Sequence, residues 1–280
     1  KCPKTLKLIR LWLRVPIKIE GKLHKRRRGV PQGSPLSPVL SNILLHELDK
    51  ELTRLKLDFV RYADDFSIYC TSRAEATGIM KVITYFLKTK LQLTINTEKS
   101  GIRRPVQFVI LGFGFASTYK KGDKGKYQLV VSEKAWNRLK QNLKSITRKT
   151  SPLSFDERIA KINETQRGWL NYFQGASISG KLRDVDGWLR NRLRYCIWHD
   201  WKKPERKRKN LIRLGVDSEH AYAWSRTRKG GWAVAQSPIL TSTITLERLR
   251  KRGYVSLSSI YRSLNPSVYE PLSTQLKLDD

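Results

Sequence analysis

Two adjacent carboxylates, Asp64 and Asp65, are the residues of this sequence best suited to carry chemistry. Residues 59–62 and 66–70 on either side are rich in aromatic and β-branched side chains, which predicts two strands joined by a tight turn. Mg²⁺ takes oxygen ligands and leaves positions for phosphate oxygens. Two such ions about 4 Å apart can activate an attacking hydroxyl and stabilise a departing pyrophosphate. The pair therefore predicts a metal site for nucleotidyl transfer, with a solvated surface turn as the plain alternative.

The residues around this acidic turn favour a site over a solvated turn. Two adjacent carboxylates in apolar surroundings need a cation to compensate them. We expect the following apolar side chains to pack against the pair: Phe59, Val60, Tyr62, Phe66, Ile68 and Tyr69.

A second candidate is the loop at residues 29–35 (GVPQGSP), about thirty residues before the turn. Small residues let a flat base or sugar approach the backbone, so Pro31, Gln32 and Gly33 are candidate nucleotide-binding residues. Ser37 is predicted as the N-cap and Pro38 as the first residue of a helix that ends near Lys56, and a helix N-terminus favours phosphate. The alternative is a plain turn before a helix.

Further elements must position these candidates. Ser72 and Glu75 predict the start of a helix, residues 91–95 and 108–115 predict two strands, and residues 121–125 predict a hairpin tip. From Ser132 onward strand patterns stop.

Three amphipathic helices with basic outer faces are then expected, the first with Trp136, Leu139 and Leu143 facing inward. The second begins at a capping box of Ser154 and Glu157, and the third covers residues 182–201. The fold class is therefore α+β, a mixed first half followed by an all-α bundle.

The composition points to a polyanionic partner. Lys and Arg number 56 against 24 acidic residues, a net charge of +32 in 280 residues. Nucleic acid is favoured over an anionic membrane surface, because aromatic residues among cations suit base stacking and no apolar stretch is long enough to span a membrane. Cys2, Cys70 and Cys196 are widely separated, which argues against a zinc module or a disulfide framework and fits a reducing compartment.

Four segments, in order, resemble conserved blocks of reverse transcriptases. Residues 29–38 (GVPQGSPLSP) resemble the fourth block, and residues 61–66 (RYADDF) the fifth, with its tyrosine–X–aspartate–aspartate turn. Residues 91–100 resemble the sixth block and residues 110–113 (ILGF) the seventh, the primer grip. Residues 169–173 (WLNYF), 188–190 (WLR) with 193–194 (LR), and 214–216 (LGV) are similar to the maturase domain of group II intron proteins. The chain thus resembles group II intron-encoded reverse transcriptases.

The resemblance implies the C-terminal part of a polymerase palm followed by an all-α thumb. Asp64 and Asp65 would bind two Mg²⁺ ions, and Lys99 would lie near the triphosphate, although an ordinary surface lysine is an equal alternative. Leu111, Gly112 and Phe113 would form the primer grip. Residues expected to bind RNA are Arg138, Lys140, Lys144, Arg148, Arg190, Arg194, Arg206, Lys207 and Arg208. The implied partners are group II intron RNA, an RNA template with a DNA primer, and deoxynucleoside triphosphates. A homodimer is left open, and no membrane is expected.

The expected domains are a partial palm at residues 1–131, a thumb or maturase domain at 132–203, a basic helical region at 204–264 and a disordered tail at 265–280. Glu20 is the only acidic residue before Gly29, so the family's first metal-binding aspartate, which would supply a third carboxylate, is expected upstream. Together with Lys1 in place of Met, this predicts a piece of a longer protein that polymerises DNA, while the piece alone is inactive. A bacterial cytoplasmic ribonucleoprotein is the expected location.

Three functions compete at this point. The first is a reverse transcriptase that copies its intron RNA during mobility. The second is a maturase, an RNA-binding splicing cofactor without polymerase activity in this chain. The third is a decayed gene product, against which the intact motifs at Gln32, Asp64 and Asp65 argue.

Overall fold

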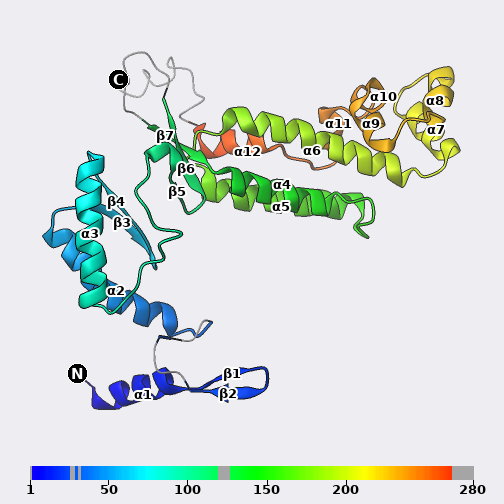
Figure 1. Ribbon diagram of the computed structural model, residues 1–280. Coiled ribbons are helices and arrows are strands. Elements are labelled where there is room, and N and C mark those ends of the chain that lie inside the picture. The colour runs from blue at the N-terminus through cyan, green and yellow to red at the C-terminus, as the bar shows by residue number, and fades with distance from the viewer. Residues whose placement is uncertain (1, 26–28, 31–32, 119–126, 267–280) are drawn as a thin grey trace, which may run out of the picture. The chain divides into compact units, whose positions relative to one another are not determined.

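A computed structural model describes residues 2–25, 29–30, 33–118 and 127–266. They form two compact units, Lys1–Ile102 and Arg103–Asp280, each described here by itself (Figure 1). Both units combine helices with small antiparallel sheets, so the α+β prediction is confirmed. The predicted palm boundary at residue 131 falls within the second unit, whereas the contacts divide the chain after Ile102.

The first unit begins with helix α1 (Pro3–Arg14) and the hairpin of β1 (Ile17–Ile19) and β2 (Lys22–His24). Helix α2 (Ser37–Arg54) follows, then strands β3 (Asp58–Tyr62) and β4 (Asp65–Tyr69), then helix α3 (Arg73–Thr89). Its core lies between α2, α3 and one face of the β3–β4 hairpin. The buried members are Leu45, Leu48, Leu52, Ile83 and Leu87.

The second unit opens with a three-stranded sheet of β5 (Val109–Ile110), β6 (Phe113–Ser117) and β7 (Tyr127–Val131), preceded by a short 3₁₀ helix (Pro105–Gln107). Three long helices follow: α4 (Glu133–Ile146), α5 (Phe155–Phe173) and α6 (Ser179–Asp200). Six shorter helices complete it: α7 (Pro204–Arg213), α8 (Ser218–Ser225), α9 (Gly231–Gln236), α10 (Pro238–Thr241), α11 (Leu246–Lys251) and α12 (Leu257–Leu264).

The three long helices lie side by side and share one core (Figure 1). Trp136, Leu139 and Leu143 of α4 are buried, as their spacing predicts. The Trp136 and Trp169 rings lie 4.7 Å apart, and so do those of Trp169 and Phe173. The Ser154–Glu157 capping box at the start of α5 is present in full. Aromatic packing and caps thus fix the bundle on which the second unit is built.

A buried carboxylate joins the last helix to the bundle. Asp186 of α6 is 2% exposed and accepts hydrogen bonds from the backbone N–H groups of Leu257 (2.8 Å) and Ser258 (2.9 Å). The Ser258 hydroxyl donates to the same carboxylate at 2.6 Å. The backbone N–H groups of Leu257 and Ser258 are the first two of α12, and they have no partner inside their own helix. An anion at a helix N-terminus is favourable, so Asp186 holds α12 against α6.

Several predicted elements differ in the structure. Residues 91–95 were expected to form a strand, but they pair with no described strand, and Leu91, Leu93 and Ile95 instead pack half-buried on the first core. The strand expected at residues 108–115 is a hairpin, because the chain reverses at Leu111 and Gly112. Helix α2 starts one residue early, with Leu36 as the N-cap and no side-chain cap from Ser37. The hairpin tip expected at 121–125 and the tail expected at 265–280 lie wholly or largely outside the described residues.

None of the helices in the described ranges combines the length and apolar character needed to cross a membrane.

Candidate active site and nucleic-acid interface

The acidic turn is the two-residue loop of the β3–β4 hairpin. Tyr62 pairs with Asp65, which leaves Ala63 and Asp64 as the turn residues. Ala63 has φ = +54°, a left-handed conformation that suits a two-residue hairpin loop because it follows the twist of the strands. The prediction of two strands joined at this pair is therefore confirmed.

One arginine connects this turn to helix α2. The Arg61 guanidinium donates to both carboxylate oxygens of Asp49, at 2.6 and 2.7 Å. It also donates to the Asn42 side chain at 3.0 Å and to the carbonyl oxygen of Ala63 at 2.8 Å. The hydrogen bonds from Arg61 lower the pKa of the Asp49 carboxyl. Arg61 thus fixes the residue immediately before Asp64 and neutralises Asp49 at the same time.

The two carboxylates of the turn itself are exposed. Neither side-chain carboxylate, of Asp64 or of Asp65, forms a hydrogen bond or ion pair with any residue that the structure describes. The expectation that six apolar side chains pack against the pair is wrong. Strand alternation turns Phe59, Phe66 and Ile68 into the core, while the other three, Val60, Tyr62 and Tyr69, lie exposed on the opposite face.

The chemistry of these oxygens fits a hard divalent cation. The adjacent carboxylates are uncompensated, whereas the nearby Asp49 is neutralised by Arg61. Mg²⁺ commonly takes only one or two protein carboxylates and completes its shell with water and phosphate. Within the described ranges no cluster of three or more His, Cys, Asp or Glu side chains could enclose a metal by itself. Asp64 and Asp65 could therefore supply one or two oxygen ligands to such a cation.

The remaining predicted nucleotide residues are only partly described. Pro31 and Gln32 lie outside the described residues, and Gly33 has φ = +82°, a conformation that favours glycine. Lys99 is an exposed residue of the first unit, and its backbone N–H donates to the Asn96 side chain at 3.2 Å. Its role at a triphosphate stays a prediction.

Two of the predicted primer-grip residues, Leu111 and Gly112, form the tight turn between β5 and β6, and the third, Phe113, begins β6. Leu111 (φ = +51°) and Gly112 (φ = +84°) are both left-handed. A Cβ at Gly112 would come within 3.1 Å of the Phe173 ring, so glycine permits the close approach to α5. The Tyr172 hydroxyl donates to the Leu111 carbonyl at 3.0 Å, and the Phe113 ring lies 4.9 Å from that of Phe173. This turn is therefore held rigidly on helix α5.

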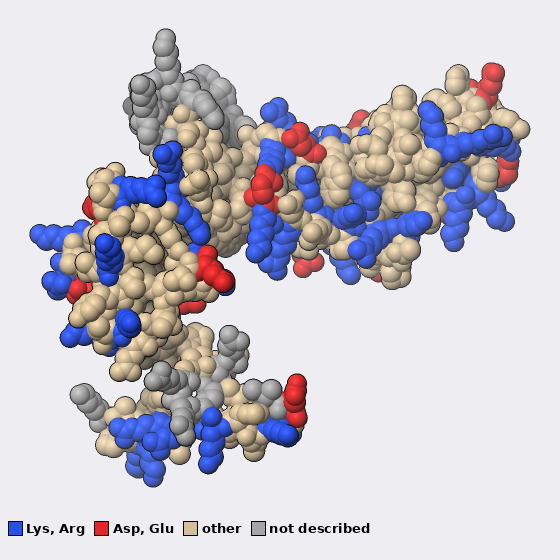
Figure 2. Space-filling view, in the orientation of Figure 1, with Lys and Arg blue, Asp and Glu red and all other residues tan. Residues whose placement is uncertain are grey.

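Most of the predicted RNA-binding residues are accessible. Arg138, Lys140 and Lys144 are exposed on α4, Arg148 is exposed just after that helix ends, and Arg206 is exposed on α7. Arg190, Lys207 and Arg208 are half-buried, with the Lys207 ammonium 4.3 Å from the Trp198 ring centre and Arg208 bonded to the Ser218 hydroxyl. In the second unit, Figure 2 shows many Lys and Arg side chains and few acidic ones on the face in view.

Arg194 differs from the other members of this set. It is 7% exposed and donates to the Ile244 carbonyl at 3.0 Å and to the Asn191 side chain at 2.8 Å. Burial, followed by the charge of Arg190, lowers the pKa of its guanidinium. Because its donors are used inside the protein, we leave Arg194 out of the RNA-binding surface.

Two arginines that the sequence patterns did not single out close the C-terminal end of α4. Arg158 is 2% exposed and donates to four carbonyl oxygens, those of Ile146, Arg148, Ser151 and Leu153, at 2.8–3.2 Å. Arg192 donates to the Thr147 carbonyl at 2.6 Å and to the Thr147 hydroxyl at 3.0 Å. The last carbonyls of a helix lack partners within it and carry partial negative charge, which the two guanidinium groups satisfy.

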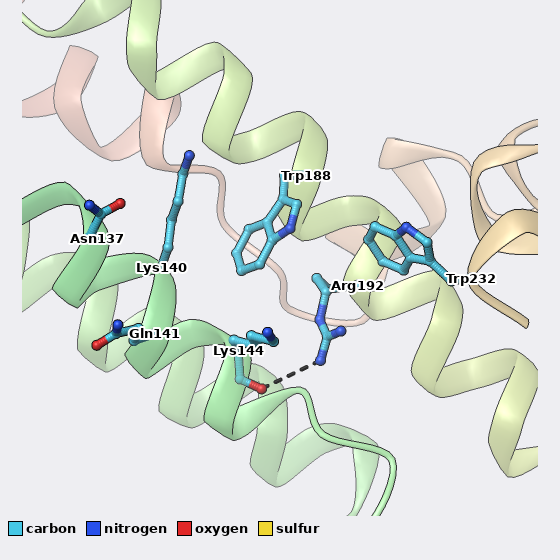
Figure 3. A pocket seen from close by; sticks show the side chains of 7 residues that line it. All are labelled: Asn137, Lys140, Gln141, Lys144, Trp188, Arg192 and Trp232. Atoms are coloured by element: carbon cyan, nitrogen blue, oxygen red, sulfur yellow. Dashed lines mark hydrogen bonds between the residues drawn. The ribbon is translucent and has the colours of Figure 1, made fainter. Parts of the chain in front are cut away.

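A hollow of about 500 Å³ lies between α4, α6 and α9. Helix α4 lines it with Asn137, Lys140, Gln141 and Lys144, whose spacing places them on one face. Helix α6 contributes Trp188 and Arg192, and α9 contributes Trp232. Figure 3 shows both indoles beside the Arg192 guanidinium, which is hydrogen-bonded to the Lys144 carbonyl. Two of the predicted RNA-binding lysines thus meet two tryptophans that sequence patterns did not link to a site.

Comparison with known proteins agrees with both halves of the chain. Residues 1–115 match the family "Reverse transcriptase (RNA-dependent DNA polymerase)". Residues 136–215 match the family "Group II intron, maturase-specific domain". The chain is 45% identical over 58 residues to group II intron-encoded protein LtrA of Lactococcus lactis subsp. cremoris, a match that covers 21% of this chain and 10% of that relative. It is 26% identical over 99 residues to telomerase reverse transcriptase of Rattus norvegicus, covering 34% and 9% respectively.

The chain matches only about a tenth of the length of these curated relatives. The two family matches nevertheless occupy different parts of it in a defined order, the polymerase family before the maturase family. Residues 1–115 thus belong to the reverse transcriptase family and residues 136–215 to the maturase-specific domain family, a combination that, with the LtrA match, supports a group II intron reverse transcriptase and maturase.

Proposed function

We propose that this chain provides the nucleotidyl-transfer carboxylates of an RNA-directed DNA polymerase, together with a surface that binds intron RNA and assists splicing. The observation that supports the polymerase function best is the acidic turn, where two uncompensated carboxylates project from a hairpin inside the region that matches reverse transcriptases. Arg61 also fixes the backbone of this turn to α2 through Asp49 and Asn42, which holds the residue before Asp64 in place.

Asp64 and Asp65 would hold Mg²⁺, which when bound supplies charge stabilisation for the transferring phosphoryl group. Arg61 is a positioning residue, because it contacts the turn backbone at Ala63 and acts on Asp64 only through it. Leu111, Gly112 and Phe113 would place the primer end, since their turn is rigid and held on α5. The incoming substrates would be deoxynucleoside triphosphates paired to an RNA template.

The RNA-binding function is supported by charge. The net charge of +32 and the exposed side chains of Arg138, Lys140 and Lys144 on α4 and of Arg148 just after it suit the phosphate backbone of a folded RNA. We propose group II intron RNA as that partner, in a bacterial ribonucleoprotein. The second candidate function is a splicing cofactor without polymerase activity, and the observation that favours it is the small number of acidic side chains at the turn.

A substitution in the intact protein separates the two functions. Asp64→Ala is expected to lower DNA synthesis from an RNA template at least about a hundredfold, since losing a metal ligand removes several kcal/mol of transition-state stabilisation. Intron RNA affinity and splicing assistance are expected to stay within about twofold, because Asp64 contributes no positive charge to RNA binding. Asp58→Ala, at the opposite end of the same hairpin, is the matched control and is expected to leave both readouts unchanged.

Two results would overturn this division of labour. DNA synthesis that survives Asp64→Ala would remove the acidic turn from catalysis. Loss of splicing assistance along with DNA synthesis would show that one site serves both functions.

A further inference from the structure

The hollow between α4, α6 and α9 has the chemistry of a nucleobase site rather than of a phosphate clamp. Three of its seven lining residues are cationic and none of those seven is acidic, while two of them are tryptophans. A hollow built only for phosphate would need the cations alone. Aromatic faces beside cations are the combination that binds an unstacked base together with its flanking phosphates.

The tryptophans are available for stacking. Trp232 is 36% exposed and Trp188 is half-buried, so each indole keeps part of its surface in the hollow. Figure 3 shows the two indoles on the same side of the hollow, carried by different helices, with Arg192 between them and α4. The cavity volume of about 500 Å³ falls within the roughly 300–1,000 Å³ of small-molecule sites, room enough for one nucleotide.

The site is also rigid before any ligand arrives. Arg192 is hydrogen-bonded to Thr147 and lies 5.7 Å from the Trp232 ring centre, and the Tyr195 ring meets that of Trp232 edge-on at 6.1 Å. A Cβ at Gly231 would come within 3.2 Å of the Tyr195 ring, so glycine lets α9 approach α6 closely enough to place Trp232. A preformed aromatic site loses little conformational entropy on binding.

The polar residues complete a nucleotide site. Asn137 and Gln141 offer amide donors and acceptors that can pair with the edges of a base. Lys140 and Lys144 form no hydrogen bond with the described residues through their ammonium groups, so their donors are available to phosphate. The pKa of the Glu133 carboxyl is lowered by its hydrogen bond with Lys181 and also by the charge of Lys140, which lies nearby. Arg192 has its donors engaged at Thr147 and therefore acts as a positioning residue for Trp232.

We propose that this hollow receives one unpaired, extruded nucleobase of the bound RNA, stacked on Trp188 and Trp232, with Lys140 and Lys144 on the neighbouring phosphates. The proposal rests on the RNA-binding function proposed above and specifies its ligand. A base inside a duplex has both faces covered by its neighbours, so the site selects bulges, loops and strand ends. An acidic peptide is a poorer fit, because it would use the lysines and leave both indoles without a stacking partner.

The test uses the 280-residue chain and two RNA duplexes that differ by a single bulged 2-aminopurine. The bulged RNA is expected to bind more tightly than the fully paired one, with its 2-aminopurine fluorescence quenched by stacking. Trp232→Ala is expected to weaken binding of the bulged RNA by roughly 5- to 140-fold, the effect of losing one base–aromatic stack. The affinity of the Trp232→Ala variant for the paired RNA is expected to stay the same. Trp232→Phe is expected to restore most of the difference in affinity between the bulged and the paired RNA.

Two further variants separate stacking from charge and from folding. Lys144→Gln is expected to weaken both RNAs alike and to reduce the salt dependence of binding. Arg192→Lys keeps the charge but loses the forked hydrogen bonds to Thr147, so it is expected to reduce only the preference for the bulge. Tyr222→Ala, a 51% exposed aromatic on α8 outside the hollow, is the control and is expected to keep the preference.

The outcomes distinguish this proposal from the one on which it rests. If neither RNA binds, the RNA-binding function itself fails. If both bind equally, without quenching and without an effect of Trp232→Ala on the bulged RNA, the nucleobase site is refuted while RNA binding stands. If a poly-glutamate peptide displaces the bulged RNA in a way that depends on Trp232, the occupant is an acidic protein segment instead.

Discussion

Replacing Arg158 by methionine tests how the bundle of the second unit is stabilised. Arg158→Met keeps the length of the side chain but removes four hydrogen bonds to carbonyl oxygens around the α4–α5 connection. A hydrogen bond from a charged group contributes roughly 1.5–3 kcal/mol, so the gross loss is about 6–12 kcal/mol. Two effects offset much of it: the buried guanidinium no longer has to be desolvated, and the carbonyls of this surface connection can bind water.

We therefore expect Arg158→Met to lower the free energy of unfolding of the second unit by about 2–4 kcal/mol. The corresponding fall in melting temperature is roughly 4–16 °C for a unit of this size. Urea unfolding followed by tryptophan fluorescence measures the change in the free energy of unfolding, since Trp136 and Trp169 lie in the same core.

Arg148→Met is the matched control, because Arg148 is exposed in the same connection and loses the same charge. We expect it to change stability by less than about 0.5 kcal/mol. Equal effects of the two substitutions would refute the reasoning, because charge removal rather than the carbonyl contacts would then explain both.

The remaining predictions concern the acidic turn, the α12 contact and the activity of the chain. Hydrogen bonds from Arg61 lower the pKa of Asp49, so this ion pair stabilises the first unit at pH values above the ordinary pKa of aspartate, near 3.9. The stabilisation is lost as the pH falls through the lowered pKa. Asp49→Asn should remove that acid sensitivity from thermal unfolding curves recorded between pH 7 and pH 2. Asp186→Asn should destabilise the second unit by about 2–4 kcal/mol in urea, because an amide offers one acceptor oxygen where four donors now meet a carboxylate. An unchanged urea midpoint would contradict this. In a primer-extension assay we expect no synthesis by the 280-residue chain alone, because no third carboxylate joins Asp64 and Asp65 among the residues described; robust synthesis would disprove it.

The sequence predicted those elements whose pattern is local and repeated. The buried stripe of Trp136, Leu139 and Leu143 and the capping box at Ser154 were both confirmed, since helical spacing and a cap are properties of neighbouring residues. The hairpin at the acidic turn was confirmed for the same reason.

The predictions that were wrong concern segments whose structure depends on partners distant in the sequence. Alternation at Leu91, Leu93 and Ile95 suits a strand, but a strand needs a hydrogen-bonding neighbour, and no described strand pairs with this segment. The reversal at Leu111 was missed because leucine is seldom left-handed, and the contacts that hold it there come from residues distant in the sequence, Tyr172 and Phe173 of α5.

The candidate sites show the same limit. Asp64, Asp65, Lys140 and Lys144 could be chosen by residue type and spacing. Nothing local marks Trp232 as a neighbour of Trp188, because three separate helices must pack before the hollow exists. Basic residues in one helix look alike in sequence, although Arg194 is buried and Arg190 is half-exposed.

Binding of a divalent ion at the acidic turn tests the central claim most directly. Mn²⁺, a paramagnetic substitute for Mg²⁺, broadens the NMR signals of backbone amides near its site, and it can be titrated into isotope-labelled chain bound to a primer–template. We expect broadening centred on residues 62–66, abolished by the double substitution Asp64→Asn and Asp65→Asn and retained in Asp58→Asn at the far end of the hairpin. Broadening centred elsewhere, or unchanged by the double substitution, would contradict the account.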